Sequence, residues 1–333
     1  MSLSEFSLIE RFFARRARRG PQRAELGIGD DCALIAPAPG EVLAVSTDML
    51  VEGRHFLPSV DPSALGHKTL AVNLSDLAAM GAKPRAFTLS LALQAPREDW
   101  LAAFAEGLFA LADRYDCQLI GGDTTRGPLN LCVTVFGDVP AQAALRRDGA
   151  RDGDDLWVSG TLGDARAGLG VLRGEWAANT FDEQALATLR HALERPEPRV
   201  ALGLALRGLA HSALDVSDGL AGDLLHILER SRMRAQVDVD AVPRSSAVRK
   251  LPLEAQRQCT LAGGDDYELL FTAPPRAREA IADAGARANV AVTRIGTISA
   301  LRHAADEPAI AWHDASHAQL SLTLHGFDHF DAN

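Results

Sequence analysis

Aspartates next to glycine or a hydroxyl residue recur at six places in the chain, mostly where one predicted element ends and the next begins. The six motifs are residues 27–31, 46–48, 73–76, 121–125, 215–219 and 263–268. Gathering carboxylates is costly unless a cation neutralises them. Carboxylates, hydroxyls and water are ligands that suit Mg²⁺, which usually joins carboxylates to substrate phosphates. Together the six motifs therefore indicate a shared site for polyvalent metal ions.

Each motif taken alone has a simpler interpretation, because aspartate and glycine both fit turns. Asp218, which precedes a predicted helix, could be no more than its N-cap. Asp76 is harder to explain in this way, since it lies between Leu74 and Leu77 in an apolar helix, away from any cap. Within the Asp30–Asp31 pair, Asp31 is the stronger candidate ligand.

Standard nucleotide and hydrolase motifs are missing from the sequence. Residues 66–69 lack the glycine spacing and the Gly-Lys pair of a Walker A loop. No G-x-G-x-x-G follows a predicted strand, and neither the kinase motif set nor a G-x-S-x-G elbow occurs. The histidines are not spaced as zinc ligands. A bound nucleotide would therefore be held by metal ions and by backbone N–H groups of glycine turns.

The elements that must position these motifs alternate between helices and strands. In the first half the pattern predicts helices and strands at 4–19 (helix), 42–47 (strand, ending at Asp48), 63–80 (helix), 86–93 (strand), 96–115 (helix), 117–121 (strand) and 130–136 (strand). A Gly-Gly-Asp turn is expected after the strand at 117–121. In the second half it predicts strands at 155–159, 213–216, 235–239, 268–272 and 292–298, and helices at 164–173, 182–194, 198–211 and 219–231. This order predicts a mixed α/β (α+β) fold.

A polar segment at 138–154 indicates a boundary between two domains. We expect an N-terminal domain at 1–140 and a C-terminal domain at 150–333. The 333 residues carry a net charge of −10, which disfavours nucleic-acid binding. There is no apolar run long enough to span a membrane, and the first residues lack the pattern of a secretory signal. Four scattered cysteines with no C-x-x-C pair fit a reducing compartment, so we expect a cytoplasmic protein.

Long, ordered stretches of the chain closely resemble bacterial thiamine-monophosphate kinases. The stretches are residues 5–9, 25–34, 46–48, 55–58, 71–82, 119–128, 214–220, 263–269 and 326–330. The resemblance implies the two-domain ATP-binding fold of aminoimidazole-ribotide synthetase and selenophosphate synthetase, with an N-terminal sheet domain that forms the interface of a homodimer. The implied reaction is the ATP-dependent phosphorylation of thiamine monophosphate to thiamine diphosphate, with several Mg²⁺ ions.

The same resemblance assigns roles to individual residues. The implied metal ligands are Asp31, Ser46, Thr47, Asp48, Asp76, Asp123, Asp215 and Asp218, and the implied catalytic carboxylates are Asp31, Asp48, Asp76, Asp123 and Asp215. The implied ATP contacts are Gly122, Asp123, Arg147 and Ser217, with the N-terminal domain binding metal and ATP phosphates and the C-terminal domain completing the site. The implied thiamine phosphate contacts are His55, Asp265 and Phe327.

Two of these positions depart from the family pattern: Asp265 stands where the family usually has Glu, and Phe327 stands where it often has Tyr or Trp. Without the resemblance, Phe327 would be interpreted as core, His55 as a surface histidine and Arg147 as one half of a salt bridge between domains. The acceptor is a phosphate monoester whose second pKa is about 6, so it is largely a dianion at neutral pH and needs no general base. The chemistry implied is direct in-line transfer at a Mg²⁺ cluster.

Two other kinds of function remain open at this point. One is a different ATP-using enzyme of the same superfamily, which would activate an amide or a selenide. The other is a non-catalytic protein that binds a nucleotide or metal. The ordered set of acidic motifs together with His55 disfavours the second alternative.

Overall fold

The computed structural model describes residues 5–20, 22–29, 31–177, 179–301, 303, 307, 309–322 and 324. The chain forms two compact units. Unit 1 consists of Met1–Leu77 and Ala82–Gln142, and unit 2 consists of Ala78–Gly81 and Ala143–Asn333. Each unit combines helices with a sheet, so the predicted mixed α/β class is confirmed. No helix among the described residues has both the length and the apolar character needed to cross a bilayer.

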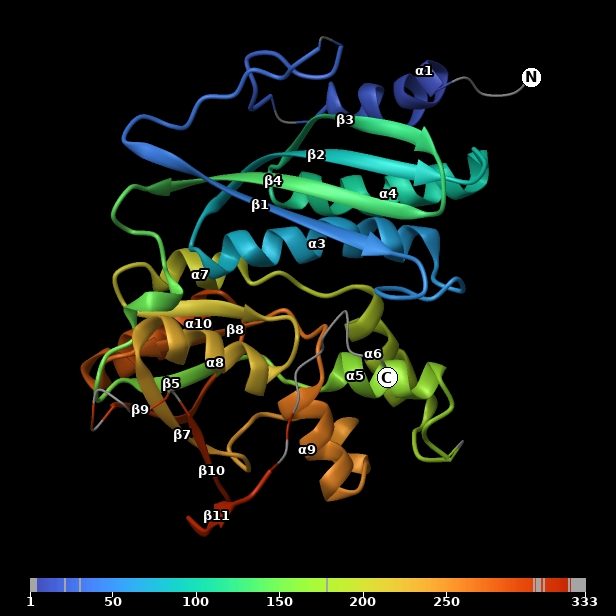
Figure 1. Ribbon diagram of the computed structural model, residues 1–333. Helices are drawn as coiled ribbons and strands as arrows, with labels where there is room; N and C mark the ends of the chain where they lie inside the picture. The colour runs from blue at the N-terminus through green and yellow to red at the C-terminus, as the bar shows by residue number, and fades with distance from the viewer. Residues whose placement is uncertain are drawn as a thin grey trace. The chain divides into compact units, whose positions relative to one another are not determined.

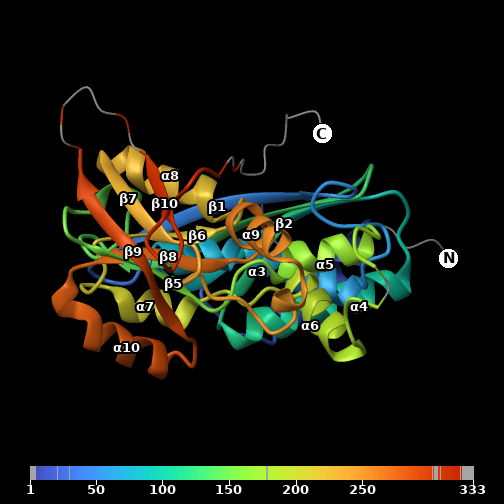
Figure 2. The same cartoon turned by 90° about the horizontal axis from the view of Figure 1, so that it is seen from below.

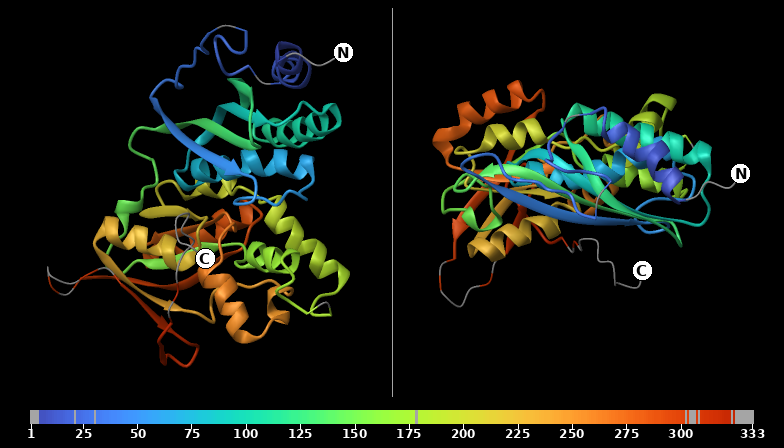
Figure 3. Two further views of the ribbon diagram at one scale, coloured as in Figure 1. Left: turned by 45° about the vertical axis from the view of Figure 1, so that its right-hand side comes forward. Right: turned by 90° about the horizontal axis from the view of Figure 1, so that it is seen from above.

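Unit 1 is built on a sheet with the strand order β1-β4-β2-β3, in which only β2 and β3 run parallel. Its elements are α1 (Glu5–Leu8), η1 (Ile9–Ala14), α2 (Arg15–Ala17), β1 (Glu41–Val51), α3 (Pro62–Ala79), β2 (Lys83–Leu93), α4 (Glu98–Arg114), β3 (Gln118–Arg126) and β4 (Asn130–Pro140). Helices α3 and α4 lie along one face of this sheet (Figures 1 and 3). That face is apolar, because every second residue of β4 is buried, namely Leu131, Val133 and Val135.

The opposite face of β1 is open to solvent. Val45 and Met49, which alternate with residues of the covered face, are 56% and 54% exposed. Thr47 between them is exposed as well. Ser46 and Asp48 share the covered face with Leu50, which is buried. The two faces of β1 therefore present different chemistry, with carboxylate and hydroxyl toward the helices and aliphatic side chains toward solvent.

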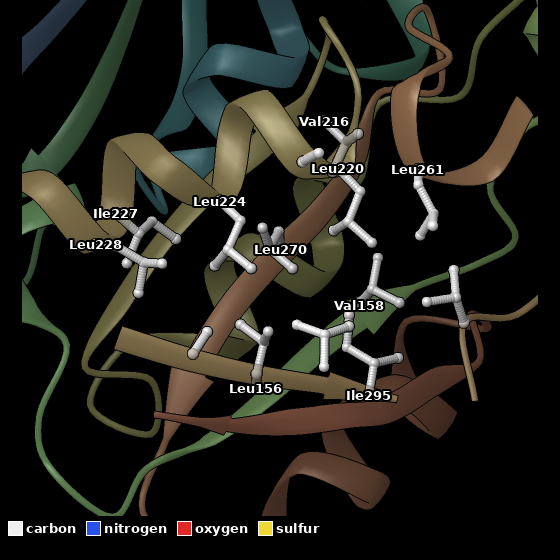
Figure 4. Packing of buried hydrophobic residues seen from close by; sticks show 14 of the residues in the cluster. Leu156, Val158, Val216, Leu220, Leu224, Ile227, Leu228, Leu261, Leu270 and Ile295 are labelled. Atoms are coloured by element: carbon white, nitrogen blue, oxygen red, sulfur yellow. The ribbon is translucent and has the colours of Figure 1, made fainter. Parts of the chain in front are cut away.

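Unit 2 contains a sheet with the order β11-β10-β7-β9-β5-β8-β6 (Figure 2). Its strands are β5 (Asp155–Ser159), β6 (Ser212–Val216), β7 (Met233–Asp238), β8 (Glu268–Ala273), β9 (Val292–Ala300), β10 (Ile310–His313) and β11 (Gln319–Leu320). Its helices are η2 (Arg147–Gly149), α5 (Asp164–Leu172), α6 (Glu183–Glu194), α7 (Val200–Leu206), α8 (Leu220–Ser231), η3 (Val248–Lys250), α9 (Leu253–Ala262), η4 (Pro275–Ala277) and α10 (Arg278–Arg287). The main core forms where one face of α8 packs on Leu156, Leu270 and Ile295 of the sheet (Figure 4).

Two expected strand ends in unit 1 are wrong. Strand β1 continues past Asp48 to Val51, and β3 passes through residues 121–123, where a turn was expected. Pairing across the sheet holds both segments extended, with Asp48 opposite Val133 and Leu89 opposite Gly122. Gly122 has a φ of 144°, and a Cβ at this position would lie 1.8 Å from the Leu89 carbonyl oxygen. Only glycine therefore allows β3 to approach β2 so closely.

Candidate active site

A pocket of about 860 Å³ in unit 1 gathers three of the predicted site residues. Asp31, Gly122 and Asp123 line it, and η1 contributes Phe13. The glycine-rich segment that carries Asp31 and the middle of β3 thus lie at one cavity, although they are far apart in sequence. Both carboxylates are exposed, so neither requires a buried counter-charge.

A second group of predicted residues forms where β1 meets α3. The Ser46 hydroxyl donates to Oδ2 of Asp76 over 2.5 Å. The backbone N–H of Asp48 donates to Oδ1 of Asn73 over 3.1 Å. Asp76 therefore lies in an apolar helix because it faces the polar side of β1. The sequence motif at 73–76 contained this signal, but only the strand partner explains it.

The side chain of Thr47 does not join this group. Its hydroxyl shares a 2.8 Å hydrogen bond with the hydroxyl of Thr134 on the open face of the sheet. Successive side chains of a strand point to opposite faces, so Thr47 is separated from Ser46 and Asp48. Any contact of Thr47 with a ligand on the covered face would have to come from its backbone.

His55 follows β1 in unit 1 and has a defined tautomer. The backbone N–H of Val51 donates to its Nδ1 over 3.0 Å, so the ring proton is on Nε2. The carbonyl oxygen of His55 accepts from Nζ of Lys68 over 3.4 Å. Lys68 is only 2% exposed on α3. In the sequence, the only signal for Lys68 is that a lysine interrupts an apolar helix, so it was given no role.

In unit 2, strand β6 carries Asp215, and the loop between β6 and α8 carries Ser217 and Asp218. Asp215 is 5% exposed at the end of β6. Oδ2 of Asp223 accepts the backbone N–H groups of Ser217, Asp218 and Gly219 over 3.0, 3.0 and 3.1 Å. Burial, with a smaller contribution from the charge of Asp218, raises the pKa of Asp223 to about 7. The sequence analysis missed Asp223, because an acid in the first turn of a helix usually only complements the helix dipole.

The loop that carries Asp265 is hydrogen-bonded to this same β6–α8 loop. The N–H of Asp265 donates to the Ser217 carbonyl oxygen, and the N–H of Tyr267 donates to the Val216 carbonyl oxygen, each over 2.8 Å. The Tyr267 hydroxyl donates to Oδ1 of Asp265 over 3.1 Å. The structure therefore brings Asp265 beside Ser217, although the two residues are 48 positions apart in the sequence.

The next two acids of the same motif support the fold. Both carboxylate oxygens of Asp266 accept the N–H of Gly163, and loss of solvation raises the pKa of Asp266 well above its usual range. Glu268 is buried and forms a bidentate ion pair with Arg199 over 2.7 and 2.5 Å. The Ser159 hydroxyl donates to the same carboxylate over 2.5 Å.

Arg147 is exposed on η2, and its carbonyl oxygen accepts a 2.8 Å hydrogen bond from the Ser231 hydroxyl. Its positive charge acts on Asp223, where it opposes the rise in pKa. Phe327 and Asp30 lie outside the described residues. In the part of the chain that the structure describes, no three His, Cys, Asp or Glu side chains are gathered closely enough to hold a metal ion by themselves.

Comparison with known proteins identifies the class that this fold and these residues define. Residues 29–139 match the family "AIR synthase related protein, N-terminal domain", and residues 151–306 match the corresponding C-terminal domain. The chain is 49% identical over 301 residues to the thiamine-monophosphate kinase of Salmonella typhimurium, covering 90% of this chain and 92% of that one. The chain belongs to the thiamine-monophosphate kinase family, so the resemblance seen in the sequence is confirmed.

Solved structures agree with this assignment. The thiamine-monophosphate kinase from Stenotrophomonas maltophilia K279a superposes with a TM-score of 0.83 at 49% identity, covering 93% of this chain and 97% of that one. AaThiL, solved in complex with AMPPCP and TMP, superposes with a TM-score of 0.73 at 28% identity, covering 98% and 97% of the two chains. The fold of the aminoimidazole-ribotide synthetase type is thereby confirmed.

Proposed function

We propose that this chain phosphorylates thiamine monophosphate to thiamine diphosphate with ATP as the phosphoryl donor. The observation that carries the proposal is the 49% identity to a thiamine-monophosphate kinase over 90% of the chain. A relative of the same fold has been solved with AMPPCP and TMP, which are an ATP analogue and the proposed acceptor. Because ATP is available inside the cell, we place the enzyme in the cytoplasm.

The proposed substrate contacts follow from the resemblance to the family. In unit 1, Gly122 and Asp123 at the 860 Å³ pocket serve the ATP phosphates. In unit 2, Arg147 and Ser217 serve ATP, and Asp265 serves the thiamine end of the acceptor. His55 carries its proton on Nε2, and this N–H suits a phosphate oxygen as acceptor. Phe327 is proposed as an aromatic contact to thiamine from the resemblance alone.

The candidate ligands supply only oxygen atoms, which fits Mg²⁺. In unit 1 the ions would be held by Asp31, Ser46, Thr47, Asp48, Asp76 and Asp123, and in unit 2 by Asp215 and Asp218. Since no three acidic groups are gathered among the described residues, phosphate oxygens and water would complete the coordination, as is common for this ion. When bound, Mg²⁺ neutralises the phosphate charges and stabilises the charge that develops during transfer.

The acceptor phosphate is already largely ionised at neutral pH, so no side chain has to remove a proton from it. What the protein must do is hold two polyanions in line and exclude water. We propose a single displacement, with no phosphorylated enzyme. An ATP with a chiral γ-phosphate should give inversion of configuration, whereas retention, or a kinetically competent phosphoprotein, would refute direct transfer.

We further propose that the protein is a homodimer that uses the open face of the unit 1 sheet. Val45 and Met49 place aliphatic side chains on this face, with the polar Thr47 between them. Exposed apolar patches on a sheet are typical of an interface. Sedimentation equilibrium should give twice the monomer mass for the wild type, and Val45→Glu/Met49→Glu should give a monomer. A monomeric wild type would refute the dimer.

The reaction itself is tested by measuring ADP release with different acceptors. Thiamine monophosphate should give rapid ADP release, while aminoimidazole precursors and selenide should give none above background. Release that depends on one of the latter would favour another enzyme of the superfamily. ATP binding with no release in any case would favour a non-catalytic protein.

A further inference from the structure

The Asp223 carboxylate holds the loop that carries two of the proposed ligand contacts. A single oxygen, Oδ2, accepts three consecutive backbone N–H groups, from Ser217, Asp218 and Gly219. Asp223 itself is 4% exposed and belongs to the first turns of α8. In an ordinary N-cap, a residue before the helix bonds N–H groups inside it. Here a residue inside the helix bonds N–H groups before it.

This arrangement changes what the loop can offer to ATP. Consecutive backbone N–H groups at a helix start commonly form a cradle for a phosphate anion. At this loop the three N–H groups already have a carboxylate as their acceptor. The loop therefore has to act through its side chains, which are the Ser217 hydroxyl and the Asp218 carboxylate.

The carboxylate is held in place by the packing of its helix. Leu220, Leu224, Ile227 and Leu228 of α8 are fully buried in the core of unit 2 (Figure 4). Gly219 has a φ of 111°, and a Cβ there would come within 2.9 Å of the Ala262 backbone. The loop has little room to move, because the buried helix α8 holds one side of it and Gly219 packs closely against the Ala262 backbone on the other.

The same helix also holds the other proposed ATP contact of unit 2. At the last residue of α8, the Ser231 hydroxyl donates to the Arg147 carbonyl oxygen over 2.8 Å and accepts the Ala150 N–H over 3.1 Å. Ser217 and Arg147 are thus both fixed to α8, one near each end. The spacing between them is set by a buried helix rather than by flexible loops.

We propose that Asp223 is a positioning residue, which fixes the Ser217 hydroxyl and the Asp218 carboxylate for the ATP phosphates. The inference rests on the proposed function, in which Ser217 and Asp218 serve ATP and its metal ions. Asp223 acts through the loop backbone and does not itself touch the substrate. Its loss should therefore affect ATP far more than thiamine monophosphate, which this loop reaches only through the hydrogen bond from the Asp265 N–H to the Ser217 carbonyl oxygen.

The test compares Asp223→Ala and Asp223→Asn with Asp182→Ala as the matched control. Asp182 caps α6 by accepting the Ala185 N–H over 2.8 Å, so its loss removes a helix cap that no substrate contact depends on. Each variant is examined for kcat, for both KM values, for melting temperature and for AMPPCP binding by calorimetry. Calorimetry reports on ATP binding without turnover.

For Asp223→Ala we expect kcat/KM for ATP to fall roughly a hundredfold, since a displacement of about 1 Å near a reacting group has that effect. The KM for thiamine monophosphate should change less than about threefold. Asp223→Asn keeps an acceptor oxygen and should lose only about fivefold, in AMPPCP affinity as well as in kcat/KM. Asp182→Ala should lower the melting temperature and leave both KM values unchanged.

The inference is wrong if folded Asp223→Ala binds AMPPCP and turns over as Asp182→Ala does, or if both KM values rise together. If Asp223→Ala does not fold, Asp223→Asn decides, and unchanged AMPPCP affinity would overturn the inference. A wild-type protein that binds AMPPCP but does not phosphorylate thiamine monophosphate would refute the proposed function instead, and the AMPPCP affinities would still decide the role of Asp223.

Discussion

Three buried acidic residues of unit 2 and two acidic residues at the unit 1 pocket stand in different surroundings. In unit 2, Asp155 and Glu268 are buried against arginines, and Asp223 is buried against backbone N–H groups. In unit 1, Asp31 and Asp123 are exposed at a pocket. The segments look alike in sequence, since both kinds place acidic residues near glycine and next to an apolar run.

From this difference we expect the exposed carboxylates at the pocket to matter for ligand binding, and buried carboxylates paired with arginine, such as Glu268, to support the fold. A buried carboxylate needs a partner, because leaving water is costly. For Glu268 this partner is Arg199, and for Asp215 we propose a bound cation. An exposed carboxylate is solvated by water and bears no such cost. It can therefore bind a cation that also binds a phosphate. Replacing acids of the two kinds should therefore affect different properties.

The largest expected effect is the loss of turnover in Asp48→Asn. Removing one charge from the proposed Mg²⁺ site should lower kcat by roughly a hundredfold or more. The melting temperature should stay the same or rise, because less negative charge is gathered near β1. Steady-state kinetics at saturating Mg²⁺ measure the loss of turnover, and thermal unfolding measures the melting temperature. The control is Asp99→Asn, which changes an exposed carboxylate paired with Arg97. Near-normal turnover of Asp48→Asn would contradict the assignment of Asp48 as a metal ligand.

The opposite result is expected for Glu268→Ala in unit 2. This change leaves Arg199 without its buried partner, and it should lower the free energy of unfolding by about 3 kcal/mol. Urea denaturation measures the loss. Glu194→Ala breaks an i, i+4 pair on α6 with Arg190, whose side chain is 53% exposed, and should cost only a few tenths of a kcal/mol. Equal losses for the two variants would show that Glu268 is not a support of the fold.

A smaller effect should appear in the pH dependence of Asp155→Asn. A hydrogen bond from Arg278 lowers the pKa of Asp155, and Arg294 adds to this. Ionised Asp155 therefore stabilises the folded protein fully above its pKa of about 3.9 in the unfolded chain. This stabilisation is lost as the pH falls through the lower pKa of Asp155 in the folded protein. At neutral pH we expect the variant to be about 1 kcal/mol less stable, since both arginines are half exposed.

Denaturation between pH 7 and pH 2 checks this prediction. The gap between wild type and Asp155→Asn should stay constant down to about pH 4 and narrow below it. A gap that widens on acidification would mean that the pKa of Asp155 is raised in the folded protein.

The smallest effect is expected for Asp265→Glu, which changes an acid of unit 2 that is only partly buried. Its φ of 68° suits Asp better than Glu. Asp265→Glu restores the usual family residue and should change the KM for thiamine monophosphate by less than about tenfold, since a bridging water can replace a direct contact. Asp265→Ala should raise that KM much more and leave the KM for ATP almost unchanged. A loss of melting temperature with equal effects on both KM values would remove Asp265 from the site.

The sequence predicted most elements well where hydrophobic periodicity decides them. Strand β5 lies at its predicted residues, and α3 differs from its prediction by one residue at each end. The prediction failed at β3, because Gly121 and Asp123 are typical of turns and only pairing with β2 keeps them in a strand. It also missed α9, whose exposed polar residues weaken the helical pattern. Such information lies in contacts between distant segments, which a local pattern does not contain.

The candidate site shows the same limit. Motif spacing found Asp76, but the reason for its position came from Ser46 on another element. Asp223 and Lys68 were missed, because a single charged residue in a helix has a common and simple explanation. Their importance follows from burial and from the groups they bond.

The central claim, that ATP phosphorylates thiamine monophosphate directly, is tested most directly by the fate of a labelled γ-phosphate. Purified protein, Mg²⁺, thiamine monophosphate and ATP labelled at the γ-phosphate are incubated, and the products are separated by chromatography. We expect the label in the terminal phosphate of thiamine diphosphate, with one ADP formed for each labelled product. Label found only in inorganic phosphate, or ADP formation independent of thiamine monophosphate, would contradict it.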